Sequence, residues 1–207
     1  MGLATPSAKG ALSKSDPVMA RVIATIEPPR AYTEHDPYIA LIESITSQQL
    51  SVKAAATIYG RLCALFPGKR PVARRLAEMD LATLRSVGLS RQKSDYVRNV
   101  ARFAMDGGLK RSLLDSMSDD EVITHLTQIK GVGRWTVEML LMFCLERPDV
   151  FSADDLGIQN AMKSLYKLES KGPALRRRMA RIATPWSPHR TLACMYLWKW
   201  LGQQKRT

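Results

Sequence analysis

The sequence predicts an all-α fold, and three observations lead to this class. Side chains that cap helices recur along the chain, together with prolines and glycines at the positions where helices start and stop. Apolar residues recur at helical spacing between these signals. No run of alternating apolar and polar residues is long enough to require a strand. A hydrophobic content of 45% in 207 residues excludes global disorder and suits one domain or two small lobes.

The first long helix should follow Asp36 and Pro37, which form a helix cap and a proline at the first helical position. This helix is expected to end near Ser47. Ser51 can cap a second helix, which should stop before Pro67. Two helices therefore meet at a short polar corner.

Three further helices are expected downstream of this pair. Short helices should cover 71–79 and 81–87, with Asp80 as the cap between them. Ser90 can cap a longer helix that ends at Gly107. Every element between the corner and this glycine is thus helical.

Residues 118–148 carry the sharpest local pattern. Ser118 and Glu121 form a capping box ahead of a short helix. Gly131 and Gly133 then stand two residues apart. Glycine adopts a left-handed backbone, or allows another group to come close to the backbone, at little energetic cost. Residues 135–145 are apolar almost all round and predict a buried central helix. The glycines by themselves would also fit an ordinary turn between two helices.

The predicted hairpin offers a small site for an anion. Its N–H groups at the start of the next helix lack partners within the helix, and the helix dipole favours negative charge there. Lys130 and Arg134 flank the two glycines and could add contacts to a phosphate. Both could equally be solvated surface charges.

The overall charge points to a polyanionic partner. There are 31 Lys and Arg against 19 Asp and Glu, which gives a net charge of +12. Nucleic acid, a ribosome or an anionic lipid surface would each suit this excess. Residues 163–181 form a basic stretch with Glu169 as its single acid, which is either a solvated face or a phosphate-binding face.

Neither the cysteines nor the histidines predict a metal centre. The three cysteines are far apart without a paired spacing, which argues against disulfides, zinc and an iron–sulfur cluster. The three histidines share no metal-binding spacing. These six residues are Cys63, Cys144, Cys194, His35, His125 and His189.

The N-terminus and the longest apolar segment place the protein in the cytoplasm. Residues 1–15 are small, polar and basic, so we expect a flexible tail without the apolar segment of a secretory signal. The longest strictly apolar run, 139–145, is far shorter than the roughly 20 residues of a membrane span. No membrane span is therefore expected, and we expect no membrane partner.

Four ordered segments, ITSQQLSVKAAATIYGRL, GLSRQKSDYV, IKGVGRWT and FSADDLGIQ, resemble the helix-hairpin-helix (HhH-GPD) DNA glycosylase superfamily, nearest to its 3-methyladenine DNA glycosylase II branch. The resemblance covers roughly residues 36–200. It implies a two-lobed all-α fold without an additional β domain. One lobe would combine 16–35 with 136–207, and a helical barrel lobe would span 36–135 and end in the hairpin at about 119–146.

The resemblance implies that Asp155 is the catalytic aspartate, with Asp154 as its structural neighbour. Cleavage of an N-glycosidic bond builds positive charge on the sugar, which a fixed carboxylate can stabilise while it orients water. Consecutive aspartates ahead of a helix are also typical caps. We therefore expect Asp154 to cap the helix and Asp155 to act in catalysis.

The resemblance also implies a pocket for the extruded base. Trp135 could stack on a cationic base, and Trp186 matches a second pocket aromatic. Met139 stands where the best-known member has a tyrosine, and Tyr38 could face the same pocket or lie in the core. Bifunctional members carry a lysine where this chain has Trp135, so strand cleavage by a Schiff base (lyase activity) is not expected.

At the polar corner the family inserts a wedge into the gap that base flipping leaves. Gln49 is the first candidate for this wedge, Leu50 the second and Gln48 the third. A buried corner in which the amides join two helix ends is the alternative.

Two further sets of residues follow from the resemblance. The expected phosphate-binding residues are Lys130, Gly131, Gly133, Arg134, Lys53 and Lys93. A structural monovalent cation could be held in the hairpin by the backbone carbonyls of Thr127, Ile129 and Val132. No cofactor is required for the reaction.

These features predict a monofunctional glycosylase of base excision repair, acting on 3-methyladenine-type and 7-methylguanine-type bases in double-stranded DNA. We expect a monomer associated with the bacterial nucleoid. A helix-hairpin-helix protein that binds damaged DNA without chemistry is the alternative. An enzyme of the endonuclease III type is disfavoured, because the lysine and a four-cysteine cluster are missing.

Overall fold

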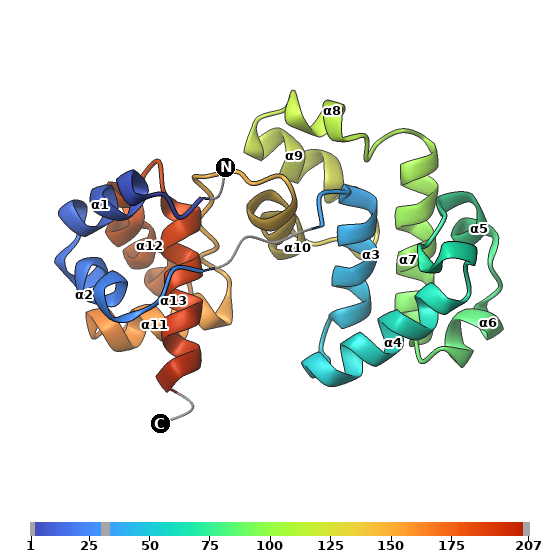
Figure 1. Cartoon of the computed structure of the whole chain (residues 1–207), viewed down its shortest axis with the longest axis horizontal. Helices are drawn as coiled ribbons and strands as arrows, with labels where there is room; N and C mark the ends of the chain where they lie inside the picture. Colours follow the sequence, from blue (N-terminus) through green and yellow to red (C-terminus); the bar gives the residue numbers. More distant parts are fainter. Residues whose placement is uncertain (1–2, 30–33, 205–207) are drawn as a thin grey trace. The chain divides into compact units, whose positions relative to one another are not determined.

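The computed structural model describes residues 3–29 and 34–204, and every regular element in this part of the chain is helical (Figure 1). The all-α expectation is confirmed there. The chain divides into two compact units, which are residues 1–32 with 141–207 (unit 1) and residues 33–140 (unit 2). The expected lobe boundaries fall after residues 35 and 135, whereas the two units of the structure meet after residues 32 and 140. Some residues of the expected tail and lobes lie outside the described residues, namely 1–2, 30–33 and 205–207.

In the part that the structure describes, unit 1 contains five helices, a 3₁₀ turn at Thr184–Trp186 and most of a π-helical turn at Leu140–Cys144. α11 packs against α12 and α13, while α2 packs against both α1 and α13. Its helices are α1 (Pro6–Ser15), α2 (Pro17–Thr25), α11 (Leu156–Tyr166), α12 (Gly172–Ala183) and α13 (Arg190–Gln204).

The N-terminal segment is part of this core, so the expectation of a flexible tail is wrong over residues 6–15. α1 begins after Thr5, whose hydroxyl accepts the N–H of Ala8 at 3.1 Å. Ala8 and Leu12 are both buried. The short apolar face of α1 carries too few residues to stand out in the sequence, but it is enough to attach the helix to unit 1.

A buried carboxylate joins the N-terminal helices to the rest of unit 1. Asp16 Oδ1 caps α2 by accepting the N–H of Val18 at 2.8 Å and of Met19 at 3.1 Å. Asp16 Oδ2 accepts the Tyr166 hydroxyl at 2.8 Å and Trp186 Nε1 at 2.9 Å. Burial and this carboxylate raise the pKa of Tyr166 well above its usual value. Four donors thus satisfy one buried charge, as burial requires.

Unit 2 is organised around α7, which packs against α3, α5 and α6 through buried Val97, Val100 and Ala101. A short 3₁₀ turn occupies Pro67–Lys69. Its helices are α3 (Pro37–Ser47), α4 (Val52–Ala64), α5 (Ala73–Glu78), α6 (Leu81–Ser86), α7 (Arg91–Met105), α8 (Arg111–Asp115), α9 (Asp119–Leu126) and α10 (Arg134–Met139).

The predicted helix caps of unit 2 are confirmed, whereas the helix expected over 71–79 begins at Ala73 and ends at Glu78. Each predicted cap accepts a backbone N–H two or three residues ahead, and the capping box is complete. These caps are Asp36, Ser51, Asp80, Ser90 and Ser118.

The segment after the hairpin differs from the single helix expected over 135–145. α10 ends at Met139, and a π-helical turn follows at Leu140–Cys144. Leu140 to Met142 and Cys144 are buried, as expected. A segment that is apolar on every side has no polar face to fix its winding, so its sequence could not distinguish an α-helical from a π-helical turn.

None of the helices in the described part of the chain combines the length and apolar content that a membrane crossing requires. In the same residues, no cluster of His, Cys, Asp or Glu has the composition of a metal site. Cys144 and Cys194 are buried thiols, and Cys63 is half-buried.

Candidate functional site

Asp155 stands at the N-terminus of α11 and is 9% exposed. Its Oδ1 accepts the N–H of Ile158 at 2.8 Å and the indole Nε1–H of Trp198 at 2.7 Å. The side chain is therefore the helix cap and is fixed by a second donor from α13. A carboxylate held by directional hydrogen bonds keeps its position without induced movement, which electrostatic catalysis requires.

The glycine of the DDLG sequence makes room for this contact. A Cβ on Gly157 would lie 2.9 Å from Trp198 Cδ1 and 3.0 Å from Asp155 Oδ1. Trp198 also packs against Phe143, with ring centroids 5.8 Å apart. Phe143 and the space at Gly157 thus fix the indole ring so that its N–H meets the carboxylate.

Asp154 does not cap α11, which corrects the expected division of roles between the two aspartates. Its side chain is 58% exposed and pairs with Arg176 Nε at 3.3 Å. Asp155 itself caps α11, and it also stands at the position expected of the catalytic acid. The cap and the expected catalytic position therefore fall on one carboxylate, whose Oδ1 accepts both the backbone N–H and the indole N–H.

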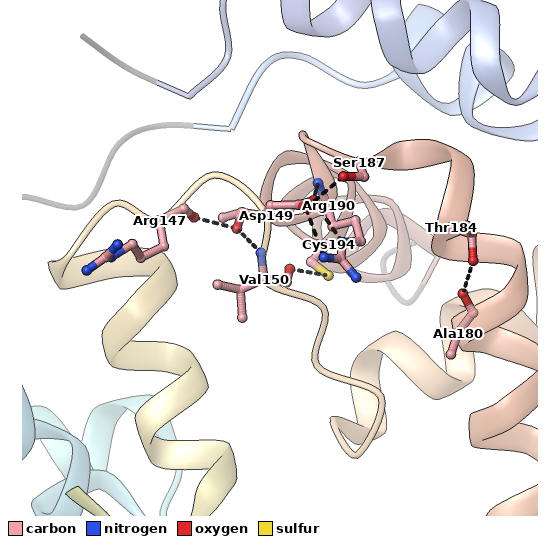
Figure 2. A network of polar contacts seen from close by, with 9 residues as sticks. Arg147, Asp149, Val150, Ala180, Thr184, Ser187, Arg190 and Cys194 are labelled. Carbon is pink, nitrogen blue, oxygen red and sulfur yellow. Dashed lines mark hydrogen bonds and ion pairs between the residues drawn. The ribbon is translucent and has the colours of Figure 1, made fainter. Parts of the chain in front are cut away.

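The chain before Asp155 is attached to the start of α13 by an ion pair (Figure 2). Arg190 contacts Asp149 through Nε to Oδ1 at 2.7 Å and through a terminal nitrogen to Oδ2 at 2.8 Å, and the Ser187 hydroxyl donates to Oδ2 at 2.8 Å. Burial alone would raise the pKa of Asp149, but the hydrogen bonds from Arg190 and Ser187 lower it below its usual value.

A buried hydroxyl makes the second attachment of this segment. Thr191 Oγ1 donates to the Arg147 carbonyl at 2.6 Å and accepts the N–H of Val150 at 3.0 Å. Cys194 Sγ lies 3.9 Å from the carbonyl oxygen of Val150. The loop that ends in Asp155 is therefore held by side chains of α13 at both of its ends.

In unit 2, the two hairpin glycines serve different needs. Gly131 has φ 108°, and a Cβ there would lie 2.2 Å from the Tyr96 ring. Gly133 has φ −95°, and a Cβ there would meet nothing within 4 Å. The fold therefore demands glycine at 131, whereas the open space over Gly133 would admit a ligand to the backbone.

The charged residues of the hairpin are at the surface. Lys130 is exposed, and its carbonyl accepts Asn99 Nδ2 at 3.2 Å, which joins the hairpin to α7. Arg134 is 59% exposed and pairs with the buried carboxylate of Glu138 at 3.0 Å. Lys53 is exposed in the first turn of α4. All three can approach a phosphate from solvent.

The predicted cation ligands lie in the turn between α9 and α10. The carbonyl of Ile129 accepts the N–H of Val132 at 2.9 Å, and Thr127 is the C-cap of α9. A carbonyl oxygen that accepts one N–H retains a second lone pair. The donor set is therefore compatible with a weakly bound monovalent cation.

The corner between α3 and α4 projects the wedge candidates. Gln49 is exposed with φ 58°, and Leu50 is 39% exposed. The N–H of Leu50 closes the turn on the Ser47 carbonyl at 3.2 Å. Gln48 is half-buried, and Lys93 Nζ donates to its carbonyl at 2.6 Å. Lys93 is thus engaged with the corner, unlike the other predicted phosphate ligands.

The four predicted pocket residues fall into two groups. Trp135 is 42% exposed in α10, and Met139 is half-buried at the end of the same helix. Tyr38 and Trp186 are buried, and Trp186 packs against Phe151 and Tyr166 besides its bond to Asp16. The pocket role expected of Trp186 is therefore replaced by a core role in unit 1. Tyr38 occupies the core position that was its alternative.

The sequence pattern of the HhH-GPD superfamily of base excision DNA repair proteins matches residues 42–188. The chain belongs to this superfamily. It is 36% identical over 185 residues to DNA-3-methyladenine glycosylase 1 of Schizosaccharomyces pombe, an alignment that covers 87% of this chain and 79% of that protein.

Two solved structures of glycosylases resemble this HhH-GPD protein. The 3-methyladenine DNA glycosylase of S. pombe in complex with abasic DNA has a TM-score of 0.82 at 35% identity, covering 93% of this chain and 95% of that chain. A DNA-3-methyladenine glycosidase from Bacillus halodurans has a TM-score of 0.85 at 33% identity, covering 100% and 94%.

Trp198 is a residue of the site in this HhH-GPD protein that no sequence pattern marked. It follows Asp155 by 43 residues, and only the packing of α11 against α13 brings the two together. The sequence contains only an indirect signal for this contact, because the glycine of DDLG leaves a space that a large neighbouring side chain must fill. The basic stretch 163–181 is not uniformly solvated, because Arg176 pairs with Asp154. Its neighbours Arg177 and Arg178 are exposed.

Proposed function

We propose that this protein is a DNA glycosylase that removes alkylated bases of the 3-methyladenine and 7-methylguanine type from double-stranded DNA in base excision repair. The observation that carries the proposal is the geometry of Asp155, whose Oδ1 is fixed by Ile158 N–H and Trp198 Nε1–H. The names of the similar proteins from S. pombe and B. halodurans support the substrate class.

Asp155 supplies the negative charge that the reaction needs. As the N-glycosidic bond breaks, positive charge develops on the sugar ring, and a preorganised carboxylate stabilises it. The same carboxylate can orient the water that attacks the sugar. A base of the 3-methyladenine or 7-methylguanine type is already cationic in DNA and leaves readily, so protonation by a second acid is unnecessary.

The features of unit 2 suit the binding of DNA. The backbone at Gly133 is open to solvent, and exposed Lys130 and Arg134 flank it, so a phosphate could be bound there without sequence selection. The exposed indole of Trp135 could stack on a cationic base. Gln49 and Leu50 are the projecting side chains that could fill the gap left by that base.

The reaction should stop after release of the base. Strand cleavage through a Schiff base needs an amine beside the sugar, and this chain has Trp135 where bifunctional members carry the lysine. We therefore expect hydrolysis without lyase activity. If a monovalent cation binds the carbonyls of Thr127, Ile129 and Val132, its contribution is to stiffen the hairpin.

The test is base release from duplex DNA that contains one 7-methylguanine, with the protein in excess. Asp155→Asn keeps a side chain able to cap α11 but removes the charge, so we expect the rate to fall by about 10²-fold to 10³-fold. Asp154→Asn is the matched control and should retain the wild-type rate. Base release that is unaffected by Asp155→Asn would refute the assigned role.

Two further outcomes separate the alternatives. A wild-type protein that binds the alkylated duplex but releases no base would be a non-catalytic damage-binding protein. Cleaved strands that form before any treatment with heat or alkali would show lyase activity and contradict the hydrolytic assignment.

A further inference from the structure

Lys93 makes contacts that a phosphate ligand would not make. It lies in the first turn of α7, and its Nζ donates to the Thr46 carbonyl at 2.8 Å and to the Gln48 carbonyl at 2.6 Å. These acceptors lie 47 and 45 residues away in the sequence, at the end of α3 and at the start of the corner. Two of the three N–H donors of the ammonium are thus directed at backbone.

The end of α3 is a favourable place for this cation. The last carbonyls of a helix have no N–H partner within the helix, and the helix dipole is negative at this end. Charge-assisted hydrogen bonds to such carbonyls are stronger than neutral ones. Lys93 is half-buried, and this burial lowers its pKa.

The corner that Lys93 contacts has a conformation that needs support. Gln49 has φ 58°, in the left-handed region that a residue with a Cβ seldom adopts. Such a conformation persists where the surrounding structure holds it. Gln48 is held by Lys93 on one side of Gln49, and on the other side Ser51 caps α4 through the N–H of Ala54 at 3.3 Å.

We infer that Lys93 is a positioning residue that holds the corner at residues 48–50 in the shape in which Gln49 and Leu50 enter double-stranded DNA. This inference rests on the proposed function, because it concerns the corner that would fill the gap left by an extruded base. A side chain that keeps base pairs apart must resist their restacking, so the backbone beneath it has to be fixed. Lys93 fixes that backbone by joining it to α7, the central helix of unit 2.

The test compares Lys93→Met with Lys53→Met, a matched loss of one exposed lysine from the same unit. The probe is a duplex with a tetrahydrofuran abasic site and 2-aminopurine as the neighbouring base, whose fluorescence rises when an inserted side chain disturbs the stack. At saturating protein, we expect Lys93→Met to reduce this rise at least threefold and to leave the salt dependence of DNA binding unchanged. Lys53→Met should keep the full rise and lower the slope of log K against log salt by about 0.9.

The reverse pattern would overturn the inference. A full rise in fluorescence with a reduced salt slope in Lys93→Met would make Lys93 a phosphate ligand. If circular dichroism shows that Lys93→Met does not fold, Lys93→Arg decides the question. Its retained charge would preserve a phosphate contact, whereas a planar guanidinium cannot reproduce an ammonium placed between two carbonyls. We expect a reduced rise in Lys93→Arg, and a full rise would refute the inference.

Failure of this inference and failure of the proposed function give different results. The fluorescence probe needs no catalysis, since its duplex holds no base to release. A wild-type protein that releases no alkylated base but loses its fluorescence response in Lys93→Met would contradict the reaction and support the role of Lys93. A wild-type protein without any fluorescence response would refute the inference directly.

Discussion

The surroundings of Asp155 in unit 1 and the hairpin of unit 2 are stabilised by different means. In unit 1, side chains fix the segment, through Trp198 Nε1 on Asp155 and Arg190 on Asp149. In the hairpin, the shape depends on the positive φ of Gly131 and on the close approach of the Tyr96 ring, which leaves no room for a Cβ at this position. One region depends on polar pairs, and the other on the absence of a side chain.

This difference follows from what each region would bind. A carboxylate that stabilises a developing charge has to be held in one place, and directional donors to its oxygens do this. A phosphate can be bound by backbone N–H groups, which any residue supplies if the chain is allowed to come close. Substitutions in unit 1 should therefore change the rate of the reaction, and substitutions in the hairpin should change stability or affinity.

The largest effect on stability is expected from Gly131→Ala, which tests how the hairpin is held. The new Cβ would lie 2.2 Å from the Tyr96 ring, and an alanine is strained at φ 108°. We expect the free energy of unfolding to fall by about 2 to 3 kcal/mol, since overpacking and backbone strain both contribute. Urea denaturation followed by circular dichroism measures this change.

Gly133→Ala is the control within the same hairpin. The backbone at φ −95° accepts an alanine, and its Cβ meets nothing within 4 Å, so the stability should remain near wild type. The added methyl group would stand where a phosphate approaches, so the affinity for duplex DNA should fall several-fold. Equal destabilisation by both substitutions would show that the two glycines do not differ in role.

These contrasts also explain which features the sequence could predict. The caps at Asp36, Ser51 and Ser118 were predictable because each acts on an N–H two or three residues away. The positive φ of Gly131 was predictable for the same reason, because it is a local property of the chain. Trp198 on Asp155 and Lys93 on the corner depend on helices that meet only in the folded chain, across 43 and 45 residues.

The N-terminal helix and Trp186 were mispredicted for the same physical reason. α1 lacks a strong apolar face, and its attachment depends on Leu12 and on the neighbouring carboxylate of Asp16. Trp186 donates to this carboxylate across 170 residues. A buried polar hub of this kind has no periodic signature, because its members come from unrelated segments.

An intermediate effect is expected from Trp198→Phe, which tests how Asp155 is held. The substitution keeps an aromatic ring against Phe143 but removes the N–H that donates to Asp155 at 2.7 Å. We expect base release at saturating protein to slow about tenfold, which corresponds to about 1.4 kcal/mol of transition-state stabilisation. The affinity for abasic DNA should stay within about twofold, because the change concerns the chemical step.

Trp200→Phe is the matched control for this measurement, since it makes the same change two residues further along α13. It should retain the wild-type rate of base release. A loss of DNA affinity in Trp198→Phe without a slower chemical step would show that Trp198 contributes to binding and does not position the acid.

The smallest effect is expected from Asp149→Asn, which tests whether polar contacts also hold the chain several residues before Asp155. The substitution keeps the shape of the side chain but replaces a charged pair with Arg190 by a neutral contact. The pair is partly exposed, with side-chain exposures of 36% for Arg190 and 26% for Asp149, so water screens it. After this discount, the loss in the free energy of unfolding at pH 7 should be about 1 kcal/mol.

The pH dependence of this loss identifies the charge as its source. The pKa of Asp149 is lowered in the folded protein, so its contribution is fully present above the unfolded value of about 3.9. That contribution disappears as the pH falls through the lower folded value, because the protonated acid then resembles asparagine. The stability difference between wild type and Asp149→Asn should therefore be constant from about pH 5 to 7, begin to shrink below about pH 4, and vanish once the pH lies below the lowered folded pKa. A difference that persists in acid would assign the effect to packing, and the segment before Asp155 would then be held by shape, as the hairpin is.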